Sequence, residues 1–221
     1  NMPALETYGA QPPNELLRQI IDQGGYYDTN KLFFKNVQDV VVCSAAAPPG
    51  GGRNEVSPRL LRHFHMVWLT NLSVKAMHTI FTAIVRGYMN IKLGSFVDLA
   101  EPMVHASVEI YMRIQQELLP TPSKSHYTFN LRDLSKVFQG LLMVQPKHLT
   151  TREGIIKLWA HEASRVFRDR LISEEDRTWF NDAVTQQLHH GLNEPNWTND
   201  DFADIIFGDF MTKENKEYQE L

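Results

Sequence analysis

The chain has 221 residues and a mass of 25.5 kDa, a size that suits one large domain or two small ones. Hydrophobic residues make up 43% and charged residues 22% of the sequence, as in an ordinary globular protein, and no apolar run approaches the length that spans a membrane. The formal net charge of −4 argues against a surface dominated by nucleic-acid contacts, while the single cysteine, Cys43, excludes an internal disulfide and a multi-cysteine metal site and fits a reducing compartment best.

The first residues, "NMPALETYGAQPP", carry neither a basic flank nor an apolar core and therefore do not predict a signal peptide. They also have no initiator-like start, so we expect the chain to be part of a longer polypeptide. A helix is predicted directly afterwards, within "PPNELLRQIIDQGG" (residues 12–25), because four apolar side chains recur there at helical spacing. The prolines before them and the glycines after them are typical start and stop signals.

Short β-rich runs follow this helix. Tyr26–Asp28 and Lys31–Lys35 are expected to form a small hairpin. Val40–Ser44 is a continuous apolar run, the pattern of a strand that is buried on both faces, and residues 65–70, "HMVWLT", have the same character. Cys43 lies in the middle of the first of these runs and is therefore expected to be a small buried hydrophobic residue rather than a nucleophile.

The segment between these runs, "APPGGGRNEVSPRLLRHF" (residues 47–64), contains a glycine run followed by arginines. A nucleotide-binding P-loop needs Gly-x-x-x-x-Gly-Lys-Ser/Thr, which is absent here, and the prolines remove amide donors that a phosphate cradle requires. Ser57 is expected to cap a short helix with Pro58 at its first position. The segment therefore reads either as a plain surface loop or as a turn that presents arginines to an anion.

Beyond residue 72 the strand signals stop and five amphipathic helices are predicted. Asn130, with Asp133 three residues later, is expected to cap the third helix, and Ser173 the fifth. The shift in composition near residues 71–73 is the candidate domain boundary. The five helical segments are "SVKAMHTIFTAIVRGYM" (73–89), "EPMVHASVEIYMRIQQELL" (101–119), "NLRDLSKVFQGLLMV" (130–144), "TREGIIKLWAHEASRVFRDRL" (151–171) and "SEEDRTWFNDAVTQQL" (173–188).

No metal site is predicted. The stretch "WAHEASR" (159–165) lacks the second histidine of a His-Glu-x-x-His zinc motif, because Arg165 stands at that position. His161 and Glu162 are therefore expected to make structural contacts. Taken alone, the residues predict an α/β segment and a helical domain with arginines available to an anion, and they do not specify a self-contained active site.

Four stretches carry a family resemblance: "NMPALETYGAQPPNELLRQIIDQGGYYD", "VVVCSAAAPPGGGRNEVSPRLLRHF", "YTFNLRDLSKVFQGLL" and "LWAHEASRVFRDRL". In this order and spacing they resemble a dynein heavy chain, and more narrowly the third AAA+ module of its motor ring, in a form closer to axonemal than to cytoplasmic dyneins. The resemblance covers essentially the whole chain.

The resemblance implies an order of parts. In this family the Walker A loop lies well upstream and the Walker B acidic residues immediately precede an "NMP"-like stretch, so the chain would lack both. The implied fold class is α/β plus all-α. Residues 1–71 would be the C-terminal part of the large AAA+ α/β subdomain, residues 72–191 the α-helical lid subdomain, and residues 192–221 the connection toward the next module.

Site residues are also implied by the resemblance. The strand at Val40–Ser44 and its exit resemble the sensor-1 element, and alignment on the double proline puts Ala47 where cytoplasmic relatives have asparagine. This departure puts efficient hydrolysis in doubt, with Ser44 as the nearest polar substitute. Arg59 or Arg62 resembles the arginine finger that acts on the neighbouring module, and the sequence does not choose between them.

Arg132 resembles the sensor-2 arginine, which projects from the lid toward the γ-phosphate of its own module. Without the resemblance, it would read as a solvated surface charge. ATP or ADP with Mg²⁺ is expected in the complete module, and no cofactor is expected for residues 1–221 alone. The implied partners are neighbouring AAA+ modules of the same heavy chain, with dynein intermediate and light chains and microtubules bound through other parts; no nucleic acid and no membrane are expected.

The resulting hypothesis is a regulatory AAA+ segment of an ATP-driven, minus-end-directed microtubule motor, located in the cytoplasm, the cytoskeleton and the axoneme of a cilium or flagellum. On its own, the segment should not hydrolyse ATP. The alternative is a nucleotide-independent structural wedge that transmits motion between neighbouring modules. A free-standing helical interaction domain is a third reading, disfavoured by the predicted buried strands.

Overall fold

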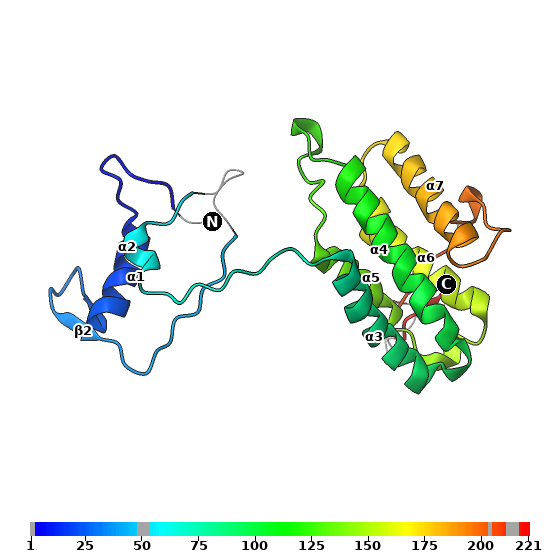
Figure 1. Ribbon diagram of the computed structural model, residues 1–221, viewed down its shortest axis with the longest axis horizontal. Helices are drawn as coiled ribbons and strands as arrows, with labels where there is room; N and C mark the ends of the chain where they lie inside the picture. The colour runs from blue at the N-terminus through cyan, green and yellow to red at the C-terminus, as the bar shows by residue number, and fades with distance from the viewer. Residues whose placement is uncertain (1–2, 48–53, 203–204, 211–216) are drawn as a thin grey trace. The chain divides into compact units, whose positions relative to one another are not determined.

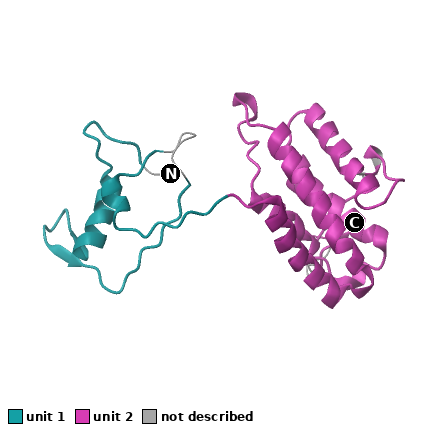
Figure 2. Ribbon diagram, viewed as in Figure 1, with its two compact units in different colours: residues 1–70 teal, residues 71–221 magenta. Residues whose placement is uncertain are grey.

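The computed structural model describes residues 3–47, 54–202, 205–210 and 217–221. The chain divides into two compact units, residues 1–70 and residues 71–221, which Figure 2 distinguishes by colour. Within the described ranges, no helix combines the length and apolar character needed to cross a membrane.

The first unit begins with α1 (Pro12–Gln23), which confirms the predicted helix (Figure 1). A proline occupies its first turn, where the missing N–H costs nothing. The helix ends at Gly24, whose φ of 69° lies in the left-handed region that glycine adopts most easily, and the Gly24 N–H donates to the Ile20 carbonyl at 3.0 Å.

The predicted hairpin is also confirmed. Strand β1 (Gly25–Tyr27) pairs antiparallel with β2 (Phe34–Asn36), with Tyr26 opposite Lys35. The connecting loop is ordered by Asp28, whose Oδ1 accepts the N–H groups of Asn30 and Lys31 at 2.9 Å each, while Lys35 Nζ lies 2.6 Å from its other oxygen. These contacts, led by the one from Lys35, lower the pKa of Asp28 to about 2.

The two buried strands predicted in this unit are wrong. Val40–Ser44 and residues 65–70 have irregular backbone, and Val41 and Val67 are 87% and 80% exposed. A strand buried on both faces needs neighbouring strands at its edges and helices over its faces. The described part of residues 1–70 has only the two-stranded hairpin, so these runs have no sheet to join.

Cys43 is exposed rather than buried for the same reason. The glycine run falls on residues 48–53, which lie outside the described residues. After it, the predicted short helix is present as α2 (Pro58–Leu61), where the Ser57 hydroxyl accepts the N–H of Arg59 at 3.3 Å. Leu60 anchors this turn, because it is almost fully buried.

The second unit contains the five predicted helices, packed around one core (Figure 1). Four of them begin at a residue whose side chain caps a backbone N–H: Ser73, Asn130, Thr151 and Ser173. The fourth helix ends five residues before the predicted segment does, and a 3₁₀ turn at Arg168–Arg170 follows it. The helices are α3 (Val74–Lys92), α4 (Ala100–Glu117), α5 (Leu131–Leu141), α6 (Arg152–Val166) and α7 (Glu174–His190).

Short 3₁₀ turns lie at the other connections, at Gly94–Leu99, Pro122–Lys124, Pro146–His148 and Asn199–Phe202. After the last of these, β3 (Phe207–Gly208) pairs antiparallel with β4 (Gln219–Glu220). Phe207 and Tyr218 pack against the core of the second unit. The described part of the C-terminal segment is therefore held on the helices.

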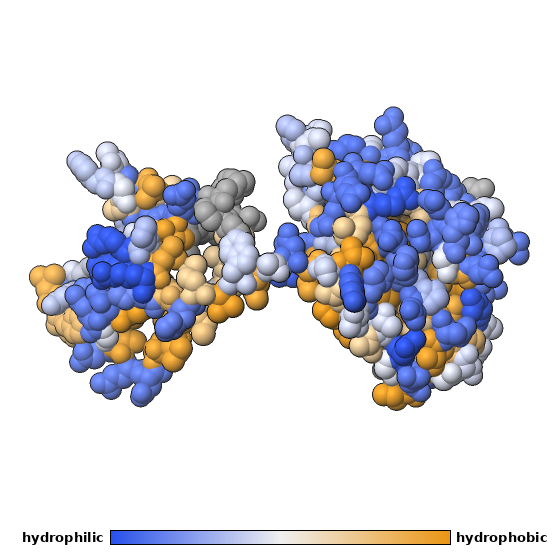
Figure 3. Space-filling model, in the orientation of Figure 1, coloured by the Kyte–Doolittle hydropathy of each residue, from blue (hydrophilic) through white to orange (hydrophobic). Residues whose placement is uncertain are grey.

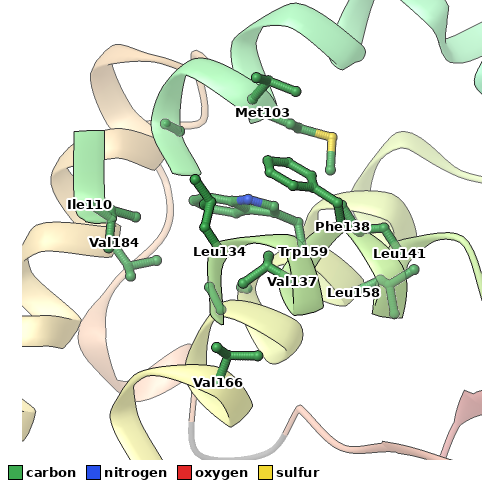
Figure 4. Packing of buried hydrophobic residues seen from close by; sticks show 14 of the residues in the cluster. Met103, Ile110, Leu134, Val137, Phe138, Leu141, Leu158, Trp159, Val166 and Val184 are labelled. Atoms are coloured by element: carbon green, nitrogen blue, oxygen red, sulfur yellow. The ribbon is translucent and has the colours of Figure 1, made fainter. Parts of the chain in front are cut away.

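The core centres on Trp159 of α6, which is fully buried (Figure 4). Its indole N–H donates to the Ser107 hydroxyl of α4 at 2.8 Å, and Ser107 in turn donates to the Met103 carbonyl at 2.7 Å. Phe138 of α5 stacks on Phe81 of α3 with ring centroids 4.6 Å apart. Helices α3 to α6 thus share one tightly packed interior, which fixes the start of α5 in place.

Candidate functional site

Arg132 lies in the first turn of α5, on a helix start that is fully capped. The Asn130 side chain accepts the backbone N–H of Arg132 at 2.9 Å, and the Asp133 carboxylate accepts the N–H of Asn130 at 3.1 Å. These reciprocal contacts are the capping box that the sequence predicted. The backbone N–H of Arg132 is therefore held by the cap at the start of the helix.

A buried ion pair anchors the same turn. Asp133 is 3% exposed, and both of its oxygens accept from the guanidinium of Arg170, at 3.0 and 3.2 Å. Burial alone would raise the pKa of Asp133, but the contacts from Arg170 and from the Asn130 N–H outweigh it and leave this pKa below its ordinary value.

Arg170 makes two further contacts, which orient it. It donates to the Thr128 carbonyl at 3.2 Å, and its guanidinium lies 5.0 Å from the centre of the Phe129 ring. Sequence reasoning missed Arg170, because no local pattern links it to a carboxylate 37 residues earlier.

The side chain of Arg132 itself is exposed, and within the described residues it makes no hydrogen bond or ion pair. The guanidinium thus projects from a rigid helix start with all of its donors available. Arginine in this state suits a bidentate contact with phosphate or carboxylate oxygens.

The arginine-finger candidates lie on α2 and at its end, in the first unit. Arg62 is exposed, donates to the His63 ring at 3.2 Å and lies 3.9 Å from Asp22 Oδ2. Arg59 is exposed too, and no described residue forms a hydrogen bond or ion pair with its side chain. Glu15 of α1 has a lowered pKa, caused first by a hydrogen bond from Arg18 and to a lesser extent by the charge of Arg59.

Arg59 and Arg132 share a property that sets them apart. Each of the other arginine side chains in the described ranges donates to a carboxylate, an amide oxygen or a ring nitrogen. The two without such a contact are two of the three arginines that the resemblance assigns to a nucleotide.

The sensor-1 candidates lie outside regular secondary structure. Ser44 and Ala47 are exposed and lie on irregular backbone, since the strand expected to carry them is not formed. Both belong to the first unit, as do Arg59 and Arg62, whereas Arg132 belongs to the second.

His161 and Glu162 make structural contacts, as predicted. Glu162 is completely buried and accepts from Arg165 and from the Tyr218 hydroxyl, while His161 Nδ1 lies 3.2 Å from the Ile205 carbonyl. Burial, and next the hydrogen bond to Glu162, raise the pKa of Tyr218. No cluster of three histidine, cysteine, aspartate or glutamate side chains suited to a metal ion occurs among the residues described.

Comparisons with known proteins divide the chain close to the boundary between the two compact units. Residues 1–72 match the model of the P-loop containing dynein motor region, and residues 75–177 match that of the dynein heavy chain ATPase lid domain. Similar proteins include dynein axonemal heavy chain 1 of Mus musculus, 47% identical over 230 residues, and dynein axonemal heavy chain 6 of Homo sapiens, 48% identical over 221 residues. Each alignment covers 96% of this chain, and the chain spans 5% of the length of either relative.

Proposed function

Because the chain belongs to the axonemal dynein heavy chain family, with an AAA motor segment followed by an ATPase lid domain, we propose that it forms part of the third AAA+ module of a motor ring. In this proposal residues 1–71 complete the large α/β subdomain, residues 72–191 are the lid, and residues 192–221 lead toward the next module. The parent would be an ATP-driven, minus-end-directed microtubule motor of the ciliary or flagellar axoneme.

Arg132 is proposed to be the sensor-2 residue, which contacts the γ-phosphate of a nucleotide bound to the same module. One observation carries this assignment: an exposed guanidinium without a partner among the described residues stands on a helix start locked by the capping box and by Arg170. Such a side chain donates to phosphate oxygens without first giving up an internal contact. Arg132 also lies in the first turn of α5, at the N-terminal end, where the backbone N–H groups of a helix favour an anion.

Arg59 is proposed to be the arginine finger, and Arg62 is the second choice. The Ser57 cap and Pro58 fix the turn that presents Arg59, and its guanidinium has no described partner, whereas Arg62 is already engaged by His63. An arginine supplied to a neighbouring site neutralises charge on the phosphoryl group during transfer, and where it operates fully it accelerates the reaction by roughly 10³–10⁵.

The module is proposed to be regulatory rather than the main hydrolytic site. Ala47 at the sensor-1 position has no polar group to orient water, and Ser44 is the nearest substitute. The 221 residues contain no Walker A sequence, so bound ATP and Mg²⁺ would depend on upstream residues for the phosphate cradle and the metal. Neighbouring AAA+ modules, intermediate and light chains and microtubules are the proposed partners of the parent.

A structural wedge without nucleotide is the second candidate, and the alanine at position 47 favours it. In that case the Asp133–Arg170 pair would serve to stiffen the lid, and Arg132 would be a solvated charge. The two candidates differ in whether Arg132 contributes to nucleotide affinity.

Calorimetry with a non-hydrolysable ATP analogue separates them. The 221-residue chain and a version extended upstream by about one domain's length would be titrated. We expect binding only by the extended form, with affinity reduced about 10- to 100-fold by Arg132→Ala, since hydrogen bonds to charged groups contribute about 1.5–3 kcal/mol. Arg86→Ala, on the exposed surface of α3, is the control and should bind like the wild type. Absence of binding by two well-folded forms would refute the sensor-2 assignment and leave the wedge.

A further inference from the structure

The loop between α4 and α5 contains Thr121-Pro122, one of the two places in the sequence where a serine or threonine is followed by proline; the other is Ser57-Pro58. Proline-directed protein kinases select a serine or threonine by the residue that follows it, because their substrate pocket at that position accepts a residue without an N–H group. Both dipeptides are therefore candidates for phosphorylation, and their surroundings differ.

Thr121 is exposed, and its backbone is extended, with φ −120° and ψ 168°. In the part of the chain that the structure describes, the hydrogen bonds of residues 119–123 all stay within the loop. The Lys124 N–H donates to the Thr121 carbonyl at 3.0 Å and to its hydroxyl at 3.2 Å, and this hydroxyl lies 3.2 Å from Ser123 Oγ. None of the three residues of the 3₁₀ turn Pro122–Lys124 is buried.

The pictures agree with this access. The loop projects beyond the end of α4 (Figure 1), and most of its surface there is hydrophilic or neutral (Figure 3). A kinase can therefore draw Thr121 and Pro122 into its cleft without breaking a hydrogen bond to a helix of the unit.

Ser57 is less accessible. It is half-buried, and its carbonyl accepts the N–H groups of Leu60 and Leu61 at 3.0 and 3.2 Å. The almost fully buried Leu60 holds the turn that Ser57 caps. A kinase would have to unfold α2 to reach this hydroxyl, so Thr121 is the better substrate of the two.

Lys124, three residues after Thr121, links the loop to the start of α7. Its Nζ lies 2.5 Å from Asp176 Oδ2 and 3.2 Å from the Ser173 hydroxyl. The Tyr127 hydroxyl donates to the same Asp176 oxygen at 2.7 Å. Because residues three apart stand on one side of a 3₁₀ turn, a group added to Thr121 can reach Lys124.

We propose that Thr121 is phosphorylated by a proline-directed kinase, and that the phosphate draws Lys124 away from Asp176 and loosens the loop from α7. The Thr121 hydroxyl oxygen forms a bond to the γ-phosphorus of ATP, the bond from that phosphorus to the β–γ bridging oxygen breaks, ADP leaves, and the hydroxyl proton passes to the catalytic base of the kinase.

Charge decides the direction of this change. The phosphate carries about −1.5 to −2 at neutral pH, more than the single charge of the Asp176 carboxylate, so Lys124 gains by turning to it. The acidic first turn of α7, Glu174–Asp176, also repels the phosphate. The modification needs neither a nucleotide at Arg132 nor the arginine finger, so it stands apart from the proposed function.

Phosphopeptide mapping of the intact heavy chain tests the site. The protein would be incubated with Mg²⁺, ATP and a mitogen-activated protein kinase, and the modified residues would be located by mass spectrometry. We expect phosphate on Thr121 and none on Ser57. Pro122→Ala keeps the hydroxyl but removes the recognition, so it should abolish the modification, whereas Thr121→Ser should retain it. No phosphate at residue 121, phosphate on Ser57 instead, or equal phosphate in Pro122→Ala would overturn the proposal.

Hydrogen exchange in the same heavy chain measures the loosening. Phosphorylation should accelerate amide exchange in residues 119–130 and in the first turn of α7 about two- to fivefold, the effect of losing a partly exposed ion pair. Lys124→Gln should cause this acceleration without phosphate, and phosphorylation of that variant should add nothing. Lys92→Gln, at the exposed end of α3, is the control and should change neither segment. Unchanged exchange after phosphorylation, or a further acceleration in phosphorylated Lys124→Gln, would overturn the link through Lys124.

Discussion

Substitution of Arg170 by glutamine tests whether the Asp133–Arg170 ion pair stabilises the start of α5. The change removes both guanidinium contacts to Asp133, whose side chain is 4% exposed and cannot regain water. The Asn130 N–H at 3.1 Å and Lys136 Nζ at 3.4 Å would remain. An unpaired buried charge costs about 3–5 kcal/mol, and the two remaining partners and the partial exposure of Arg170 reduce the expected loss of unfolding free energy to about 2–3 kcal/mol.

Thermal and urea unfolding, followed by circular dichroism, measure this loss. For a protein of this size we expect the melting temperature to fall by about 5–10 °C at neutral pH. The pKa of Asp133 is lowered from 3.8 in the folded chain, so the pair contributes stability above that value and loses it as the pH falls through the lower, folded pKa. The difference between wild type and Arg170→Gln should therefore shrink below about pH 4.

The pair between Arg86 and Glu101 is the matched control, because these side chains are 51% and 72% exposed. Arg86→Gln should change the unfolding free energy by less than about 0.5 kcal/mol. A loss for Arg170→Gln no larger than that of the control, or a loss that persists unchanged in acid, would refute the conclusion that this buried pair holds the start of α5.

Three further predictions concern the second unit. Gly140→Ala should lower the unfolding free energy by about 2 kcal/mol in urea titrations, since the added Cβ would clash with the Glu162 carboxylate, which Arg165 and Tyr218 hold in place. Gly87→Ala, where a Cβ would meet open space, should not destabilise, and equal effects of the two substitutions would contradict this reasoning. Tyr218→Phe should cost about 1–2 kcal/mol and speed proteolysis of the C-terminal segment, because it removes the hydroxyl donor to Glu162; an unchanged cleavage rate would refute the contact. The pKa of His78, measured by NMR, should lie below 6.5, first because the ring is partly buried and second because the ring of His105 stacks on it, although Glu109 and Glu101 oppose the shift. The free energy of unfolding should then fall as the pH drops through 6.5. A pKa at or above 6.5 would contradict the stacking.

Local signals in the sequence predicted most of the elements. The glycine at the end of α1, the cap at Asn130 and the cap at Ser173 each determine a helix boundary through contacts within a few residues. The strands predicted at Val40–Ser44 and residues 65–70 are not formed, because a buried strand needs neighbouring strands and the described part of residues 1–70 offers none for them to pair with. Both runs are as apolar as the sequence suggested, but their side chains are largely exposed, with Val41 at 87% and Val67 at 80%.

For the candidate site, too, the local features could be predicted from the sequence and the long-range contacts could not. The position of Arg132 in the first turn of a capped helix followed from the sequence alone. The arginine that anchors this turn did not, because Arg170 and Asp133 are far apart along the chain and meet only when α5 and α6 pack. The link between Tyr218 and Glu162, 56 residues apart, was invisible for the same reason. Long-range ion pairs between polar residues leave no periodic pattern in a sequence.

The Asp133–Arg170 pair has a mechanical consequence. Arg170 lies in the 3₁₀ turn between α6 and α7, so its bond to Asp133 couples that connection to the first turn of α5. Tension applied to the α6–α7 connection would reach the first turn of α5 through the two hydrogen bonds between Arg170 and Asp133, at 3.0 and 3.2 Å. A displacement of this connection would therefore change the position of the helix start that carries Arg132.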